Sequence, residues 1–405
     1  MVVSARMIPV QSRSTDTRLR VCVVGGGTRF LSGISYYTHR LSDALARSHD
    51  VSVILMRQLL PTHLYPGRNR VGKELARLAY PPDVPVFDGV DWFWLPSIVR
   101  AVAFLVRQRP DVIVFEWWTG TVLHSYLLLM IVARLLGARI VIEFHEVLDT
   151  GEQQIPLAQA YVRLIAPLVV HLAQGFVLHS EYDQEALREQ YKLGDRPSVL
   201  VPHGPYDQYQ RRRDETGDGE TRATPFNLLY FGVIRPYKGL EDLITAFNML
   251  PEKDVSQFHL TVVGETWEGW TVPGQQIARS LYRDHITFVN RYVNDEEVEA
   301  FFAAADAVVL PYHRSSSSGP LHIAMSHGLP VVVTHVGGLI EAARGYGGAV
   351  FVPPHDPIAI RQAFNQVAQM RDQRFVDPHS WEHTVERFNV LFAVSERGTS
   401  IHRET

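Results

Sequence analysis

Two basic residues stand just before a predicted helix in the second half of the chain. The segment FGVIRPYKGLEDLITA is an apolar run followed by Arg235, Lys238 and a helical pattern of apolar residues. A guanidinium fork, an ammonium charge and the positive end of a helix dipole all attract anions. We therefore predict an anion site at Arg235 and Lys238, with two solvated loop cations as the alternative.

A glycine cluster follows the first predicted strand, in the segment VVGGGTRFLSG. Gly25-x-Gly27-x-x-Phe30 is an incomplete dinucleotide fingerprint, because Phe30 replaces the third glycine and no acidic residue ends the second strand. This disfavours nicotinamide binding. Ser32 and Gly33 would instead present backbone N–H groups to a phosphate at a helix start, and a plain strand-to-helix turn is the alternative.

A histidine follows another apolar run, in the segment RIVIEFHEV. The alternation of side chains along a strand places Glu143 on the same side as His145. A metal site built on this pair needs a third ligand, which the sequence does not make evident. A histidine with a purely structural role is the other alternative.

The elements that position these residues alternate between strands and helices. Apolar runs without polar alternation indicate strands covered on both faces, as in a parallel sheet, and helices between them make the sheet doubly wound. Helical spacing is found at 35–48, 240–250 and 295–305. Strands are predicted at 20–25, 51–56, 111–115, 139–144, 175–178 and 198–201, and again at 227–233, 259–264, 286–289, 307–310 and 330–333.

The strand pattern breaks in a polar, arginine-rich stretch and then restarts. We therefore predict an α/β protein with two doubly wound Rossmann-like domains that face a central cleft, where the carboxyl ends of the strands place ligands. The predicted parts are a flexible tail at 1–18, a first domain at 19–207, a linker at 208–224 and a second domain at 225–379.

Composition excludes several other classes of protein. The 405 residues are 46% hydrophobic and 20% charged, as in globular proteins. A net charge of -4 provides no global basic field for nucleic acid, and the single Cys22 favours a reducing compartment. Residues 1–18 lack the apolar stretch of a secretory signal, and the apolar run 117–133 is shorter than the ~20 residues of a membrane span. We expect a cytoplasmic protein with a buried helix at 117–133.

The motifs of the second half, taken in order, resemble the family-4 retaining glycosyltransferases of the GT-B fold. The matching pieces are FGVIRPYKGLEDLITAF, LTVVG, DAVVLPY, SGPLHIAMSHGLPVVVT and VGGLIE. The first half matches more loosely, through the glycine cluster, His145 and the segment VPHGPYD. The resemblance implies transfer of a hexose from a nucleotide-diphosphate sugar to a glycan or lipid-linked acceptor. It also implies that an apolar helix at about 380–394 crosses back onto the first, acceptor-side domain.

The resemblance assigns roles to the matching positions. Arg235 and Lys238 would hold the diphosphate, His145 would contact the transferred sugar or the acceptor, and Glu341 would face the donor sugar. The remaining donor-binding positions are the phosphate-facing helix start at Ser318, Gly319, Pro320 and Leu321, the base-facing loop at Tyr292 and Val293, and Gly264 at the end of a strand.

The transfer implied by the resemblance builds negative charge on the leaving diphosphate in an oxocarbenium-like transition state. A metal ion can stabilise that charge, but the usual metal motif of two aspartates separated by one residue occurs nowhere in the sequence. We therefore expect metal-independent transfer with no cofactor, in which Arg235 and Lys238 replace the metal. In the same-face mechanism usual for this family, the donor phosphate accepts the acceptor's proton.

One departure from the family pattern keeps other functions open. Many relatives carry two glutamates around the Ser/Gly loop, and Ser315 and Ile323 stand in their places. A branch of the family carries a Ser-Gly-x-Leu loop, which the segment SGPL resembles. The alternatives are a non-catalytic GT-B scaffold or partner subunit, a nucleotide-sugar epimerase and, least favoured, a dehydrogenase.

A basic segment in the first half suggests a membrane contact. Residues 57–80 contain five Lys or Arg residues and one Glu, a net charge of +4, with leucines interleaved. Such a segment would meet anionic lipid at the cytoplasmic face, where a lipid-linked acceptor lies. An ordinary solvated helix and loop is the alternative.

Overall fold

The computed structural model of the chain describes residues 18–27, 33–57, 78–147, 156–209, 225–266 and 269–400, without the side chains of 156, 208 and 394–400. Ser32 and most of the basic segment 57–80 lie outside these residues. Of the predicted tail only Arg18 is described, and its Nε lies 3.0 Å from Asp50 Oδ1.

The first half of the chain forms a parallel sheet, as predicted. Its apolar strands are buried on both faces, and Val21 to Val24 are fully inaccessible. The strand order is β3-β2-β1-β4-β5-β6-β7. The bounds are β1 (Arg20–Gly26), β2 (Asp50–Met56), β3 (Val86–Val90), β4 (Val112–Trp117), β5 (Arg139–Phe144), β6 (Gly175–Leu178) and β7 (Ser198–Leu200).

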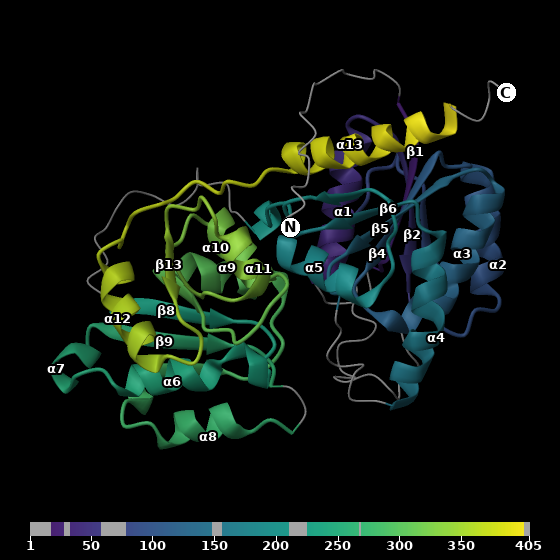
Figure 1. Cartoon of the computed structure of the whole chain (residues 1–405). Helices are drawn as coiled ribbons and strands as arrows, with labels where there is room; N and C mark the ends of the chain where they lie inside the picture. Colours follow the sequence, from purple (N-terminus) through teal and green to yellow (C-terminus); the bar gives the residue numbers. More distant parts are fainter. Residues whose placement is uncertain are drawn as a thin grey trace, which may run out of the picture.

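Helices cover both faces of this sheet (Figure 1). One face packs against α1 (Gly33–Ala46), and the other packs against α2 (Ser97–Gln108), α3 (Leu123–Leu135) and α4 (Pro156–Leu172). A further helix, α5 (Glu181–Gln190), follows β6. The predicted buried helix at 117–133 is therefore α3, which begins only after Trp117 has ended β4 and after the short 3-10 helix η3 (Gly120–Val122).

The second half repeats the architecture with six parallel strands in the order β10-β9-β8-β11-β12-β13. The strands are β8 (Phe226–Phe231), β9 (Phe258–Val263), β10 (Ile286–Val289), β11 (Ala307–Leu310), β12 (Val331–Thr334) and β13 (Ala349–Val352). The helices are α6 (Leu240–Asn248), α7 (Glu252–Val255), α8 (Val272–Arg279), α9 (Asp295–Ala304), α10 (Gly319–Ser326), α11 (Gly337–Ala342) and α12 (Pro357–Ala368). The 3-10 turns are η5 (Asp207–Tyr209), η7 (Pro236–Lys238) and η8 (Arg283–His285).

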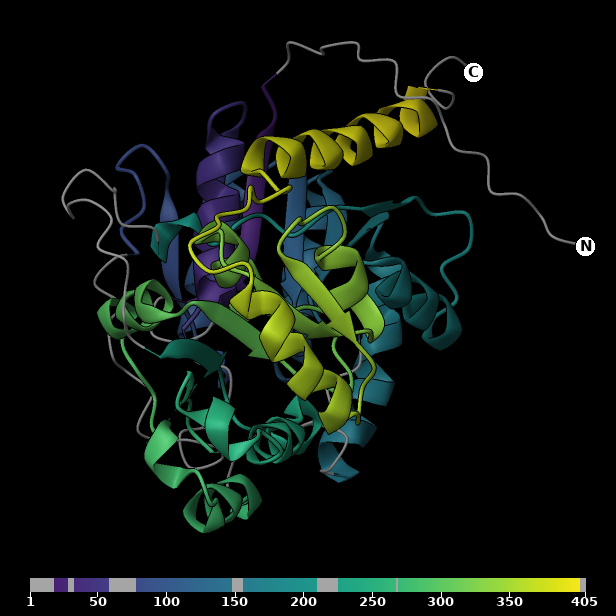
Figure 2. The ribbon, with the colours of Figure 1, turned by 90° about the vertical axis from the view of Figure 1, so that its left-hand side faces the viewer.

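The last helix, α13 (Trp381–Ser400), lies along the first sheet beside α1 and away from the second sheet (Figures 1 and 2). Its apolar stripe, with Phe388 and Leu391, joins the same core as the inner face of α1. Trp381 Nε1 donates to the carbonyl of Pro205 at 3.0 Å. The chain thus leaves the first domain, forms the second and returns.

The two domains touch at the carboxyl ends of their strands. The Tyr36 hydroxyl of α1 donates to Asp295 of α9, and the ring of His203 stacks on that of His322 with centroids 4.6 Å apart. The exact domain boundaries stay a prediction, because residues 210–224 lie outside the described ranges. Among the described residues, no helix combines the length and the apolar character that crossing a bilayer requires.

Candidate functional site

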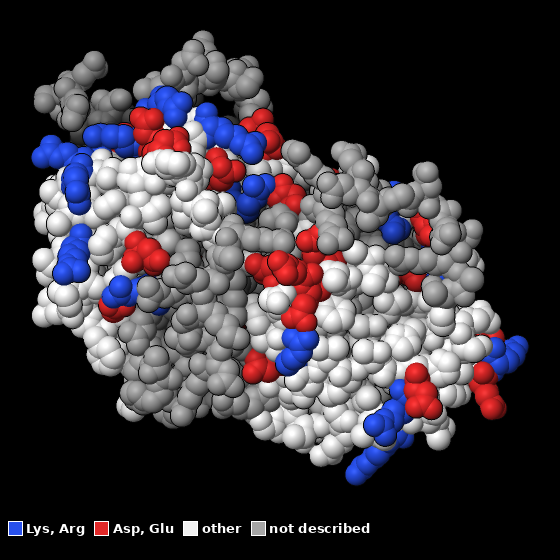
Figure 3. Space-filling view, turned by 180° about the vertical axis from the view of Figure 1, so that it is seen from behind, with Lys and Arg blue, Asp and Glu red and all other residues white. Residues whose placement is uncertain are grey.

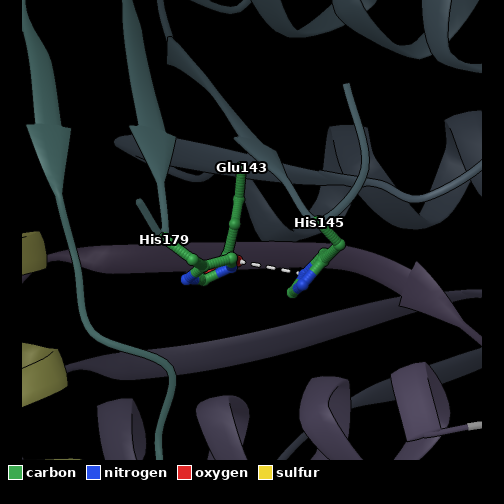
Figure 4. A group of neighbouring side chains, drawn as sticks. All are labelled: Glu143, His145 and His179. Carbon is green, nitrogen blue, oxygen red and sulfur yellow. Dashed lines mark ion pairs between the residues drawn. The ribbon is translucent and has the colours of Figure 1, made fainter. Parts of the chain in front are cut away.

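His145 lies at the interdomain edge of the first sheet because it directly follows β5. Phe144 pairs with Leu178 of the neighbouring strand β6, so the next residues, His145 and His179, emerge side by side. Glu143 points to the same side, as the alternation predicted: its Oε2 lies 3.9 Å from His145 Nε2 (Figure 4). Glu143 Oε1 lies 3.5 Å from His179 Nε2.

Burial governs the charge of this group. It raises the pKa of Glu143 to about 8 and lowers the pKa of His179 to about 4. Burial, and next the imidazoles of His179 and His203, hold the pKa of His145 well below its ordinary value. The Tyr37 hydroxyl donates to Glu143 Oε1 at 2.5 Å and orients the carboxyl group. At neutral pH the histidines are therefore uncharged.

His179 was missed by the sequence analysis, although a signal for it existed. It follows the predicted strand GFVL in the same way as His145 follows RIVIEF. Two neighbouring strands of a parallel sheet that each end in histidine bring the imidazoles together. His203 and His322 were also missed, and their stacking depends on how the two domains meet.

Lys238 and His145 line one small cavity between the domains. Its volume is about 130 Å³, and Ser315, Ser316 and Arg314 of the second domain complete much of its wall. Lys238 ends η7, with its Nζ 3.8 Å from the ring centroid of Tyr312. Burial lowers the pKa of Lys238 to about 8.

Arg235 precedes the same turn and sits beside Lys238. Its Nη1 donates to the Tyr237 hydroxyl at 3.4 Å, and both cations are partly buried. Both cations are thus more enclosed than the alternative of two solvated loop cations implies, and the anion site itself stays a prediction. Arg314 lines the cavity wall together with Lys238, and no motif in the sequence had singled it out.

The Ser/Gly loop opens a helix at the predicted place. The Ser318 hydroxyl caps α10 by accepting the N–H of Leu321 at 3.4 Å. Leu321 is fully buried, and a Cβ on Gly319 would lie 3.8 Å from the Tyr206 hydroxyl of the first domain. Pro320 stands in the first turn of α10. Neighbouring Ser316 and Ser317, rather than these four residues, line the cavity.

Gly264 directly follows β9, where the backbone passes very close to Gly232, the residue after β8. Its φ is +156°, and a Cβ there would lie 1.9 Å from the carbonyl oxygen of Gly232, so a side chain cannot fit. Tyr292 and Val293 follow β10, the strand next to β9. The Val293 side chain is 5% exposed and packs in the core, which leaves its backbone as the part able to meet a base.

Glu341 makes a contact that its predicted role did not include. Its carboxylate in α11 accepts the backbone N–H groups of Glu181 at 2.7 Å and Tyr182 at 3.2 Å, at the start of α5. It therefore caps a helix of the first domain across the boundary. It also lines a larger cavity of about 320 Å³ with His203, His322 and Arg387.

Two further predicted positions mark the limits of the described site. Gly33 begins α1, and its carbonyl accepts the Tyr206 hydroxyl at 3.3 Å, whereas Ser32 lies outside the described residues. Where relatives carry glutamates, Ser315 reaches the cavity wall and Ile323 is 5% exposed in the second core.

The face in Figure 3 shows charged side chains in small groups of both signs, separated by uncharged surface.

Comparison with known proteins matches both halves of the chain. Residues 32–204 match the model of the Glycosyl transferase 4-like domain, and residues 225–370 match that of Glycosyl transferases group 1. The chain is 30% identical over 166 residues to O-antigen chain mannosyltransferase B of Escherichia coli, covering 38% of this chain and 42% of that protein. It is 30% identical over 239 residues to D-inositol 3-phosphate glycosyltransferase of Geodermatophilus obscurus, covering 54% and 52%. The chain thus spans about half the length of these relatives.

The whole fold also has counterparts among solved structures. Anabaena Alr3699/HepE in complex with UDP and glucose superimposes with a TM-score of 0.64 at 16% identity, over 95% of this chain and all of that one. At this identity the likeness concerns the fold: two parallel-sheet domains around a cleft.

Proposed function

We propose that this chain, which belongs to the GT-B glycosyltransferases by both of its domains, transfers a hexose from a nucleotide-diphosphate sugar to a glycan or lipid-linked acceptor. The observation that carries the proposal is the cavity shared by His145 of the first domain and Lys238 of the second. A leaving diphosphate needs positive charge, and a reacting sugar needs a hydrogen-bonding partner, within one enclosed space.

In the proposed reaction the chain's own cations stabilise the leaving group. Lys238 and Arg235 would bind the diphosphate as negative charge grows on it, supported by the N–H groups at the start of α10. Ser315, Ser316 and Ser317 would line the cavity wall beside the bound sugar. His145 would hydrogen-bond a hydroxyl of the sugar or the acceptor.

We further propose that the anomeric configuration is retained. In a same-face reaction the donor phosphate accepts the acceptor's proton, so no pair of protein carboxylates is required. The buried position of Glu143, turned toward histidines and Tyr37, agrees with this reading. NMR of the product before anomeric equilibration tests it: an inverted linkage would contradict the proposal.

The diphosphate is proposed to need no metal ion, because two cations already stand there. Adding millimolar Mg²⁺ or Mn²⁺ to the assay should change the rate by less than about twofold. A strong dependence of the rate on either metal ion would show that Arg235 and Lys238 are not sufficient to stabilise the leaving diphosphate.

A donor screen is the experiment that tests the function as a whole. The full chain is incubated with UDP- and GDP-sugars, and released nucleoside diphosphate is measured. We expect turnover with one base and sugar. Binding of a nucleoside diphosphate without turnover of any donor would instead favour the non-catalytic subunit. The relatives named above are transferases, which favours transfer over epimerisation.

For a lipid-linked acceptor we propose contact with the cytoplasmic face of the membrane through residues 57–80. Two ends of this segment are engaged elsewhere: Arg57 Nε donates to Asp91 at 2.8 Å, and Leu78 is buried in a core. The contact would therefore rest on residues between them. Flotation with vesicles of anionic lipid in low salt tests it, and the absence of binding would exclude it.

A further inference from the structure

Three buried side-chain atoms at the end of the first sheet face one another without hydrogen-bond partners. They are Glu143 Oε2, His145 Nε2 and His179 Nε2. One ligand atom from each residue lies within 4.8 Å of the others, and the three side chains point toward a common centre (Figure 4). Orphaned buried polar atoms are costly, so three that converge require an explanation.

The protonation of His179 makes the arrangement less favourable still. Its Nδ1 lies 2.9 Å from the carbonyl of Val201, which only accepts, so Nδ1 carries the proton. The neutral ring therefore turns the lone pair of Nε2 toward the carboxyl group of Glu143. Glu143 Oε1 already accepts a hydrogen bond from Tyr37. Lone pairs thus meet lone pairs unless a proton or a cation lies between them.

We propose that Glu143, His145 and His179 bind a divalent transition-metal ion, with Zn²⁺ as the best match. Two imidazoles and one carboxylate are a known Zn²⁺ ligand set, with the fourth position left to water. Tetrahedral Zn²⁺ with bonds of 2.0–2.1 Å separates its ligand atoms by roughly 3.4 Å. His145 Nε2 lies 3.9 Å from Glu143 Oε2, and His179 Nε2 lies 3.5 Å from the other carboxylate oxygen, Oε1. All three residues offer a ligand atom within 4.8 Å of the others, so binding needs the side chains to close in on the ion.

The surroundings are those of a metal site. A ligating histidine ordinarily donates its other N–H to a backbone carbonyl, as His179 does to Val201, and a ligating carboxylate is itself hydrogen-bonded, as Glu143 is by Tyr37. The ion would tie the ends of β5 and β6 together and fix the ring of His145 at the cavity wall.

A second group of possible ligands in the described chain lacks these features. Asp242, His313 and His355 also lie close together. However, His313 Nε2 already bonds Asp242 at 2.8 Å, and the His355 side chain is 65% exposed. This group is satisfied as it stands and provides a control.

The proposed ion is separate from the diphosphate and does not depend on the proposed function. It revises the expectation, drawn from sequence, that the chain holds no metal. The alternative explanation is that Glu143 is protonated and that its acid proton, rather than a metal ion, lies between the carboxyl group and the histidine nitrogens. A protonated Glu143 predicts no metal binding, so a measurement of metal content distinguishes this alternative from the metal site.

The first test uses the unaltered full-length chain. We expect one equivalent of Zn²⁺ by elemental analysis after loading and gel filtration. Replacement by Co²⁺ should give visible absorption bands typical of four-coordination by nitrogen and oxygen. A chain that retains no Zn²⁺ and shows no Co²⁺ bands would overturn the proposal without any variant.

The second test locates the ion. His179→Ala should weaken Zn²⁺ affinity, measured against a chromophoric chelator, by at least about 100-fold, and Glu143→Gln by at least about 10-fold. Glu143→Gln keeps the shape of the side chain and so limits damage to folding. The matched control His355→Ala should bind Zn²⁺ like the unaltered chain. The site would be refuted if His355→Ala lost Zn²⁺ binding, or if His179→Ala and Glu143→Gln bound Zn²⁺ as tightly as the unaltered chain.

Discussion

Lys238 lies over the ring of Tyr312, with its Nζ 3.8 Å from the ring centroid. The aromatic face stabilises the ammonium charge and holds it at the wall of the cavity shared with His145. The same burial lowers the pKa of Lys238 to about 8, which places its titration within the range of an ordinary assay.

Donor affinity should therefore fall as the pH rises through 8. Lys238 is charged below its pKa and neutral above it, so the attraction for a diphosphate is present at pH 7 and decreases by pH 9. Isothermal calorimetry with a nucleoside diphosphate at several pH values measures the effect. The variant Lys238→Arg, which stays charged, should show a much flatter profile. Parallel profiles for the two proteins would assign the dependence to another group.

The two cations should govern turnover. Arg235→Ala or Lys238→Ala is expected to lower kcat by on the order of 10²–10³, as when one preorganised donor to a developing anion is lost. Lys238→Ala should also lower the free energy of unfolding by about 1 kcal/mol, because the contact with Tyr312 disappears. The exposed Lys253 of α7 provides the control, since Lys253→Ala should change neither. Either cation variant retaining more than about half the rate would contradict the assignment.

Nucleotide affinity should come mainly from the diphosphate. Charge-assisted hydrogen bonds contribute about 1.5–3 kcal/mol each, and a neutral ribose contact about 1 kcal/mol. We expect the nucleoside diphosphate to bind much more tightly than the monophosphate, and the free nucleoside hardly at all, in calorimetry. Similar affinities for all three would mean that the loop before α10 does not bind phosphate.

A pair of substitutions at Gly319 tests that loop directly. A Cβ there would lie 3.8 Å from the Tyr206 hydroxyl, which is ordinary contact, so Gly319→Ala should keep most of the diphosphate affinity. Gly319→Val adds branches that crowd Tyr206 and the backbone N–H groups, and should weaken binding about tenfold or more. The quantity to measure is the difference in nucleoside diphosphate affinity between the two variants. Equal affinities would show that Gly319 does not take part in phosphate binding.

Glu341 should hold the domains together. Its carboxylate caps α5 across the boundary, a contact worth about 1 kcal/mol. Glu341→Ala should increase the radius of gyration in small-angle scattering and lower the melting temperature, whereas the exposed Glu252→Ala should not. If Glu341→Ala instead weakens donor binding with unchanged scattering, the carboxylate contacts the donor sugar, as the family resemblance implies.

The sequence predicted both sheets because strands buried on two faces have a distinct, uniformly apolar pattern. The strands β3 and β13 were missed: VFDGV is short and contains a charged residue and a glycine, and AVFV has only four residues. The pairing of Glu143 with His145 followed from alternation within one strand. The capping of α5 by Glu341 and the stacking of His203 on His322 join residues of different domains, and no local pattern specifies how two domains meet. The donor-binding assignments stay predictions.

Because α13 returns to the first domain, the chain leaves that domain and re-enters it at places that lie side by side. The outgoing chain at Pro202 and Pro205 is hydrogen-bonded to the returning chain at Thr384 and Trp381. The outgoing and the returning chain are therefore tied to each other on the first-domain side. Two crossings tied together in this way should resist twisting of one domain against the other more than a single crossing would, so we expect any opening of the cleft to occur about one axis.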